Sequence, residues 1–221
     1  NMNITLDTYI ISDTHFGQDS ITKKERMRNL IANNLGYKNH FDLIVDNWNK
    51  EVSQKDGILH LGDVYFKDGL SYLKKLNGKK MLIIGNNDIN KLDKLEKMNF
   101  EMKNKVILKI PQKEKIREKI KQKYGKIQEK IYLNGIIIDI GGERILFSHF
   151  PVFNRKPNDK FCAIRDVLDD YFRFSDCSLN IHGHTHSKET NNPFCINVSV
   201  EQTMLSPIKL KKILKNYRRS L

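Results

Sequence analysis

The sequence predicts an α/β fold built around a parallel sheet, and three recurring features support this prediction. Apolar runs at residues 8–12, 57–61 and 80–84 have the length and β-branched or aliphatic character of buried strands. Between them lie segments with helical apolar spacing, as in Phe41, Ile44, Val45 and Trp48. Each run also ends in polar side chains. Strands that alternate with helices indicate parallel pairing of the strands.

The remaining elements follow in chain order. Helices are expected at residues 21–35, 41–52 and 70–76, with the single tryptophan, Trp48, in the core. Residues 135–140 and 143–147 are expected to form a hairpin, because the two-residue turn Gly141-Gly142 separates them. A helix over about 160–172 and strands at 178–181 and 194–200 come next. A last helix places four apolar residues on one face: Leu210, Ile213, Leu214 and Tyr217.

Residues 91–130 have the heaviest lysine content of the chain. Apolar residues recur there every three or four positions, at Ile116, Ile120, Tyr124, Ile127 and Ile131. This spacing predicts a helix with one narrow apolar stripe, which packs lightly on the body or projects from it. We therefore expect a single domain over 1–221 with a Lys-rich helical insertion at about 103–131. The insertion could serve as a lid or a basic arm, or only present a solvated face.

Composition limits the function classes. The 221 residues are enough for one sizeable core, and 39 Lys and Arg against 26 Asp and Glu give a net charge of +13. This charge permits binding to nucleic acid or another polyanion. Three cysteines without C-x-x-C spacing predict neither a disulfide framework nor a zinc finger, and they favour a reducing, cytoplasmic location. We expect no membrane span, and Asn1, which precedes Met2, is left out of the fold argument.

Side chains that can bind metals follow the predicted strands. In open α/β sheets, ligands bind outside the carboxyl ends of the strands. A single residue of this kind would be explained by an ordinary role in a turn or in the core. His60 lies inside its strand and is expected to be a packed core residue. The stretch 181–186 presents His182, His184 and His186 at alternate positions, so strand geometry would make three imidazoles converge. The candidate ligands are Asp13, His15, Asp63, Asn86, His149, His184 and His186.

These candidate ligands are too many for one structural zinc ion, and they suit two divalent ions. Imidazole, carboxylate and amide ligands together favour Mn, Fe, Zn or Ni, and Mn is the expected metal in vitro. Two such ions can bind a phosphoryl group and generate a nucleophile from water.

The ordered set of motifs, D-x-H at 13–15, G-D at 62–63, G-N-x-D at 85–88, His149 and G-H-x-H at 183–186, resembles the calcineurin-like metallophosphoesterase family. S-D-T-H-F-G at 12–17 and N-V-S-V-E at 197–201 further resemble a small bacterial and phage phosphoesterase subgroup. The resemblance implies a four-layered α-β-β-α sandwich with two mixed β-sheets. It also implies that a hydroxide bridging the two ions attacks phosphorus. The implied ligands are Asp13, His15 and His186 on one ion, Asn86, His149 and His184 on the other, and Asp63 between them.

Two positions depart from the pattern of this family. Asn87 stands where the family has a histidine that contacts the phosphate and protonates the leaving oxygen, and Asp88 would be the acid that orients that group. Asparagine donates hydrogen bonds but gives up no proton, and the loss of a general acid typically costs about 10²–10⁴-fold in rate. Gln18 stands where the subgroup often has another histidine, which suggests a substrate or outer-shell contact.

The sequence therefore predicts a dinuclear metal-dependent phosphohydrolase that cleaves phosphate esters, as a phosphodiesterase or phosphatase. Asn87 and Asp88 are the expected catalytic residues, and Asn87 and Gln18 the expected substrate contacts. Two alternatives stay open. Asn87 is compatible with a catalytically weak metal-binding scaffold or partner-binding module. The +13 charge and the Lys-rich helix are compatible with a metal-dependent nuclease acting on nucleotides or nucleic acid.

Overall fold

The computed structural model describes residues 3–126 and 132–221, and this part of the chain forms two mixed five-stranded sheets. In the first sheet, four neighbouring strands are parallel and only β10 at the edge is antiparallel. In the second sheet, only the β6–β7 pair is antiparallel. The first sheet has the order β10 (Ile208–Lys209), β1 (Tyr9–Ile11), β2 (Gly57–His60), β3 (Lys79–Leu82) and β4 (Phe100–Met102). The second has the order β5 (Val106–Lys109), β6 (Gly135–Ile140), β7 (Glu143–Ser148), β8 (Leu179–His182) and β9 (Cys195–Asn197).

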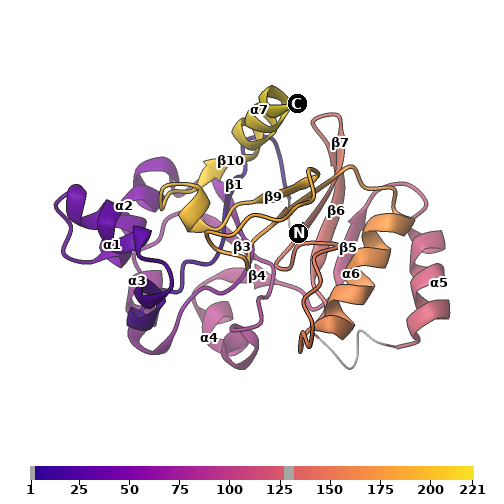
Figure 1. Ribbon diagram of the computed structural model, residues 1–221, viewed down its shortest axis with the longest axis horizontal. Helices are drawn as coiled ribbons and strands as arrows, with labels where there is room; N and C mark the ends of the chain where they lie inside the picture. The colour runs from indigo at the N-terminus through magenta and orange to yellow at the C-terminus, as the bar shows by residue number, and fades with distance from the viewer. Residues whose placement is uncertain (1–2, 127–131) are drawn as a thin grey trace.

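Helices cover the outer faces of the two sheets and complete a four-layered α-β-β-α sandwich, as expected. Figure 1 shows α1, α2 and α3 on one side of the molecule and α5 and α6 on the other, with the strands between them. The C-terminal helix α7 lies at the edge where the two sheets meet (Figure 1). The helices are α1 (Met27–Asn34), α2 (His40–Glu51), α3 (Leu70–Leu73), α4 (Leu92–Lys97), α5 (Lys113–Tyr124), α6 (Cys162–Phe174) and α7 (Leu210–Ser220).

The apolar side chains form three layers, because successive residues of a strand point to opposite faces of its sheet. In β1, Ile10 belongs to the cluster between the sheets, whereas Tyr9 and Ile11 belong to the cluster under α1–α4. A third cluster joins the second sheet to α5 and α6. Burial of each large aliphatic or aromatic side chain contributes about 1.5–3 kcal/mol, so these layers fix the two sheets face to face.

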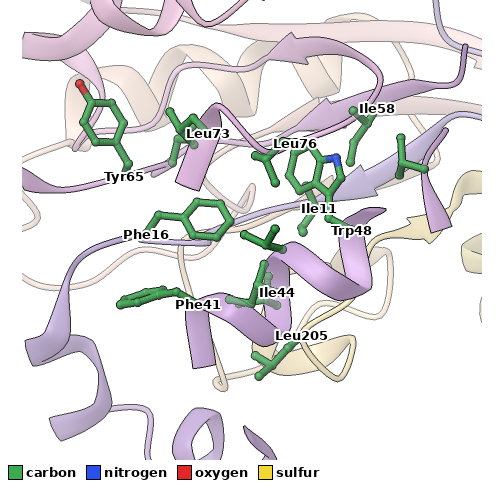
Figure 2. Close-up of a cluster of buried hydrophobic side chains, with 14 of the residues drawn as sticks. Ile11, Phe16, Phe41, Ile44, Trp48, Ile58, Tyr65, Leu73, Leu76 and Leu205 are labelled. Carbon is green, nitrogen blue, oxygen red and sulfur yellow. The ribbon is translucent and has the colours of Figure 1, made fainter. Parts of the chain in front are cut away.

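The outer cluster of the first sheet holds the loop after β1 in place. Phe16, in that loop, packs with Phe41 of α2, and Trp48 belongs to the same cluster (Figure 2). Trp48 is fully buried, as expected for a core residue, and its Nε1–H donates to the carbonyl of Asn77. The loop that starts at Asp13 is therefore anchored on a rigid layer.

The Lys-rich segment differs from the expected helical insertion. It contains the short strands β4 and β5 as well as α5, and β5 is an edge strand of the second sheet. Strands of three or four residues among lysines give too little alternation to be recognised in the sequence. The predicted stripe on α5 is present at Ile116 and Ile120, which are buried against the α6 layer; Ile127 and Ile131 lie outside the described residues.

Smaller differences concern the N-terminal helices and one strand. The helix expected at 21–35 is a 3₁₀ turn, Asp19–Lys23, followed by the separate helix α1. Strand β10, which pairs with β1, was not predicted because only two residues form it. The Gly141-Gly142 hairpin is confirmed, with φ of 61° and 81° at the two glycines. All three cysteines are free. Within residues 3–126 and 132–221, the helices are too short or too polar to cross a membrane.

Candidate metal centre

The candidate ligands lie in the loops that follow five strands of the two sheets. Asp13 and His15 follow β1, Asp63 follows β2 and Asn86 follows β3. His149 follows β7, and His184 and His186 follow β8. Five of these residues have a left-handed backbone, with φ between 49° and 68°: Asp13, His15, Asp63, His184 and His186. Such conformations cost on the order of 1–3 kcal/mol each and persist only where the surroundings impose them.

Asp13, His15 and His186 form the first group whose donor atoms could share one ion. One donor atom from each lies within 4.8 Å of the others. Asp13 Oδ1 is 3.7 Å from His15 Nε2 and 3.8 Å from His186 Nε2. Asp13 Oδ1 and His15 Nε2 are buried and have no hydrogen-bond partner among the described residues. Buried polar atoms without a partner are costly, so their convergence fits a cation.

Asp63, His149 and His184 form the second group, again with donor atoms within 4.8 Å of one another. His149 Nδ1–H donates to the carbonyl of Leu61, so Nε2 presents its lone pair to Asn86 Oδ1 at 2.9 Å and His184 Nδ1 at 3.2 Å. Burial and the nearby His149 lower the pKa of His184 to about 3, so its ring is neutral. Facing acceptor atoms of this kind fit a bound metal ion.

Asp63 joins the two groups. Its Oδ2 atom is 3.5 Å from His15 Nε2 in the first group and 3.6 Å from His149 Nε2 in the second. The side chain is almost fully buried. One carboxylate oxygen therefore lies between two clusters of imidazole nitrogens, which suits a ligand shared by two ions.

Hydrogen bonds fix which nitrogen of each imidazole is free. Gln18 Oε1 accepts a hydrogen bond from His15 Nδ1 at 2.6 Å, and Glu201 Oε1 accepts one from His186 Nδ1 at 3.0 Å. In both rings Nε2 is then left to face Asp13. Gln18 therefore orients the candidate ligand His15. A histidine that binds a metal commonly donates its other ring N–H to an acceptor of the protein in this way.

Asp13 is held by its other oxygen. Oδ2 accepts hydrogen bonds from the hydroxyls of Ser12 and Ser199 and from the backbone N–H of His184, at 2.6, 3.1 and 2.8 Å. Gly183 lies against this arrangement so closely that a Cβ there would overlap Ser12 Oγ and Asp13 Oδ2. The glycine is thus required by a close approach of two loops, and Asp13 Oδ1 is left free for a ligand.

Arg28 and Glu201 form a buried ion pair behind His186, which the sequence alone did not reveal. Arg28 Nε and Nη2 donate to Glu201 Oε1 at 2.8 and 2.7 Å, and Arg28 also donates to the carbonyls of Asp13 and Thr14. Burial opposes a charge on His186, but Glu201 and Asp13 outweigh it and raise the pKa of His186 to about 9. In the sequence, Glu201 is indicated only as the last residue of the motif at 197–201, and no motif contains Arg28.

Asn87 and Asp88 take different positions in the centre. The Asn87 side chain donates to Asp63 Oδ2 at 2.7 Å, so it reaches the carboxylate oxygen between the two groups. Asp88 is fully buried and accepts three backbone hydrogen bonds, from Asp63, Val64 and Gly85. Burial and the Asp63 carboxylate raise the pKa of Asp88 to about 6. Asp88 therefore ties together the loops after β2 and β3.

Two of the histidines considered in the sequence, His182 and His60, stand apart from the metal groups. His182 was expected to converge with His184 and His186, but it is the last residue of β8 and its Nδ1–H donates to the carbonyl of Gly183. The convergence prediction was wrong because His184 and His186 lie in a loop with left-handed residues, not in an alternating strand. His60 is a packed residue, as expected: Nδ1 accepts from the N–H of Gly62, and Nε2 bonds Thr14.

Comparisons with known proteins agree with this geometry. The family model for calcineurin-like phosphoesterases matches residues 6–188. A protein of unknown function from Aquifex aeolicus shares 25% identity with a TM-score of 0.66, over 95% of this chain and 98% of that one. An archaeal phosphodiesterase shares 16% identity with a TM-score of 0.38, over 86% of this chain and 81% of that one. Chaetomium thermophilum Vps29 shares 14% identity with a TM-score of 0.35, over 86% of this chain and 69% of that one. Both are too dissimilar to support an argument. No curated protein sequence matches. On the family match, the chain belongs to the calcineurin-like phosphoesterases.

Proposed function

We propose that the protein is a dinuclear metal-dependent phosphohydrolase that cleaves phosphate esters. The observation that carries this proposal is the position of Asp63, whose Oδ2 atom lies 3.5 and 3.6 Å from imidazole nitrogens of two separate ligand groups. Asp13, His15 and His186 would hold one ion, and Asn86, His149 and His184 the other. A ligand set of imidazole, carboxylate and amide suits Mn, Fe, Zn or Ni, and Mn²⁺ is the ion we would use in vitro.

Two divalent ions in such a site neutralise phosphoryl charge and supply a nucleophile from water near neutral pH. The protein's own part is to hold the ligands and to exclude water from behind them. Asp13 and Asp63 are almost completely buried, and their backbones are anchored by Arg28 and Asp88. Preorganised charges of this kind contribute to catalysis because they need no rearrangement when the reaction occurs.

Asn87 determines which esters the protein should prefer. Its amide can bind an oxygen of the substrate, but it has no proton to give to a departing alkoxide. We therefore expect efficient cleavage of esters with good leaving groups, such as aryl or cyclic nucleotide phosphodiesters, and slow cleavage of alkyl monoesters. Similar efficiency on alkyl and aryl esters would contradict this assignment.

Hydrolysis of bis(p-nitrophenyl) phosphate with and without Mn²⁺ tests the proposal. The parent protein should show metal-dependent turnover, and Asp63→Ala should abolish it because both ions lose a shared ligand. Glu114→Gln is a matched control, since Glu114 is exposed on α5 in an ion pair with Arg117. Turnover that is independent of metal, or that survives in Asp63→Ala, would refute the proposal.

A second candidate function is a metal-binding scaffold that presents the loaded centre to a partner. Asn87, which bonds Asp63 and lacks a transferable proton, is the observation that favours it. This function predicts two bound ions together with no hydrolysis of any aryl phosphodiester. If Asn87→His then hydrolysed the diester, the absence of activity in the parent protein would be due to the asparagine at position 87.

A further inference from the structure

Each metal group has a partly buried phenyl ring packed on one of its imidazoles. Phe66 stacks on His15 of the first group, with ring centroids 5.5 Å apart and an interplanar angle of 11°. Phe161 meets His184 of the second group edge to face, at 6.3 Å and 90°. Both phenylalanines are half-buried, so the rings form part of the wall beside the centre.

Each of these rings also carries a lysine. Lys91 Nζ lies 3.9 Å from the centroid of Phe66, and Lys160 Nζ lies 4.9 Å from that of Phe161. Adding the phenyl–imidazole separation to each lysine–phenyl distance gives an upper limit for the distance from the ammonium to the imidazole. Lys91 Nζ is at most 9.4 Å from the His15 ring centroid, and Lys160 Nζ is at most 11.2 Å from that of His184. A cation over a phenyl face is held there by about 0.5–1 kcal/mol or more. One ammonium group therefore accompanies each metal group.

Neither lysine is neutralised by a carboxylate of the described residues. Some other basic side chains of the fold are paired, such as Lys123 with Asp170 and Arg155 with Asp169. Within residues 3–126 and 132–221, the Lys91 ammonium donates a hydrogen bond only to the carbonyl of Tyr65, although the side chain is half-buried. Burial lowers its pKa, and the Asp88 and Asp63 carboxylates oppose that shift from nearby. A partly desolvated ammonium without an anion is an expensive feature unless an anionic ligand uses it.

We propose that Lys91 and Lys160 bind the phosphates that neighbour the scissile one, and that the substrate is a nucleic-acid strand. This inference rests on the proposed function, because the scissile phosphodiester is taken to lie at the two metal groups. Both ammonium groups sit on phenyl rings that contact a candidate ligand, so each lies close to one metal group and can contact a phosphate next to the one held there. Lysines combined with aromatic rings along a backbone track are the usual means of binding single strands.

The net charge of +13 agrees with a polyanionic substrate, but it does not locate the contact. Bis(p-nitrophenyl) phosphate has a single phosphate and no neighbours, so it can report on the metal centre alone. A short oligothymidylate offers phosphates on both sides of every internal linkage. Comparing these two probes separates the metal chemistry from recognition of the strand.

The test measures binding of a fluorescein-labelled oligothymidylate to the Mn²⁺-loaded protein by fluorescence anisotropy, between about 50 and 200 mM KCl. Phosphorothioate linkages slow hydrolysis during the titration. The variants are Lys91→Met, Lys160→Met and both together, because methionine keeps much of the apolar stem and removes the charge. Lys215→Met is the matched control: Lys215 is exposed on α7, which carries none of the candidate ligands.

Each phosphate contact on a single strand contributes about 0.7 to the slope of log affinity against log salt. Lys91→Met and Lys160→Met should each make the slope shallower by about 0.7, and the double variant by about 1.4. Slopes that match the parent, a change only in Lys215→Met, or no binding at 50 mM KCl would overturn the inference. A protein that binds the strand through both lysines yet is inert on bis(p-nitrophenyl) phosphate with Mn²⁺ would refute the proposed function and leave the lysine assignment standing.

Discussion

Replacing Glu201 with glutamine tests how the protein holds His186 in place. Glu201 Oε1 accepts hydrogen bonds from His186 Nδ1 and from Arg28, and the side chains of Glu201 and Arg28 are 1% and 0% exposed. Glutamine keeps the shape and one acceptor oxygen but removes the negative charge. Glu201→Gln therefore leaves Arg28 as a buried cation without its carboxylate partner, bonded to the retained amide oxygen and to two backbone carbonyls.

Two effects of Glu201→Gln follow from this geometry. Loss of one member of a buried ion pair typically costs about 3–5 kcal/mol of stability, and the retained hydrogen bond places the expected loss near 3 kcal/mol. Loss of the outer partner of a ligating histidine typically weakens metal binding about 10–100-fold, so one Mn²⁺ site should weaken by that factor. Urea unfolding in EDTA, followed by Trp48 fluorescence, measures the first effect, and isothermal titration calorimetry with Mn²⁺ measures the second.

The control is Glu114→Gln, which removes an ion pair with the same 2.7 Å separation in which Arg117 is 42% and Glu114 75% exposed. Exposed pairs contribute at most about 1 kcal/mol, so this variant should resemble the parent in both assays. The reasoning would be refuted if Glu201→Gln lost less than about 1 kcal/mol and bound two Mn²⁺ ions with parental affinity.

Three further predictions test single residues. Asn87→His should raise hydrolysis of alkyl esters by about 10²–10⁴-fold and of p-nitrophenyl esters by much less; equal gains would contradict a missing proton donor. His60, whose pKa burial lowers from 6.5 to about 3, stays neutral in the folded protein while the unfolded chain takes up a proton. Stability in EDTA should therefore fall as the pH drops below 6.5, by about 1.4 kcal/mol per pH unit more steeply than in His60→Gln; parallel curves would show that His60 protonates in the fold. Gly183→Ala should cost about 1–3 kcal/mol, because its Cβ would overlap Asp13 and Ser12, and should weaken one Mn²⁺ site; parental stability would show that the loops can separate.

Much of the fold was predictable because apolar runs around buried strands and amphipathic helices leave clear patterns in the sequence. The strands at β1, β2 and β3 and the hairpin at Gly141-Gly142 were all found in this way. Strands β4, β5 and β10 were missed, since they lie among lysines and other polar residues and not in a five-residue apolar run like those around β1, β2 and β3. Their pairing is decided by tertiary contacts, which local patterns do not contain.

The ligand types in the centre were visible in the sequence, but their arrangement was not. His182 shares the spacing of His184 and His186, yet it is a buried residue of β8, because the positive φ angles of the other two break the alternation. Arg28 is 173 residues from Glu201 in the sequence, so no local pattern could pair them. Such long-range hydrogen bonds depend on the folded arrangement of the chain and can be seen only in the structure.

The number of Mn²⁺ ions bound per chain, measured by calorimetry together with elemental analysis after dialysis, tests the central claim most directly. The account predicts two ions per chain in the parent protein. In Asp63→Ala both sites should weaken, because Asp63 Oδ2 lies between the two groups at 3.5 and 3.6 Å from their imidazoles. A single bound ion in the parent, or two undisturbed ions in Asp63→Ala, would contradict a dinuclear centre bridged by this carboxylate.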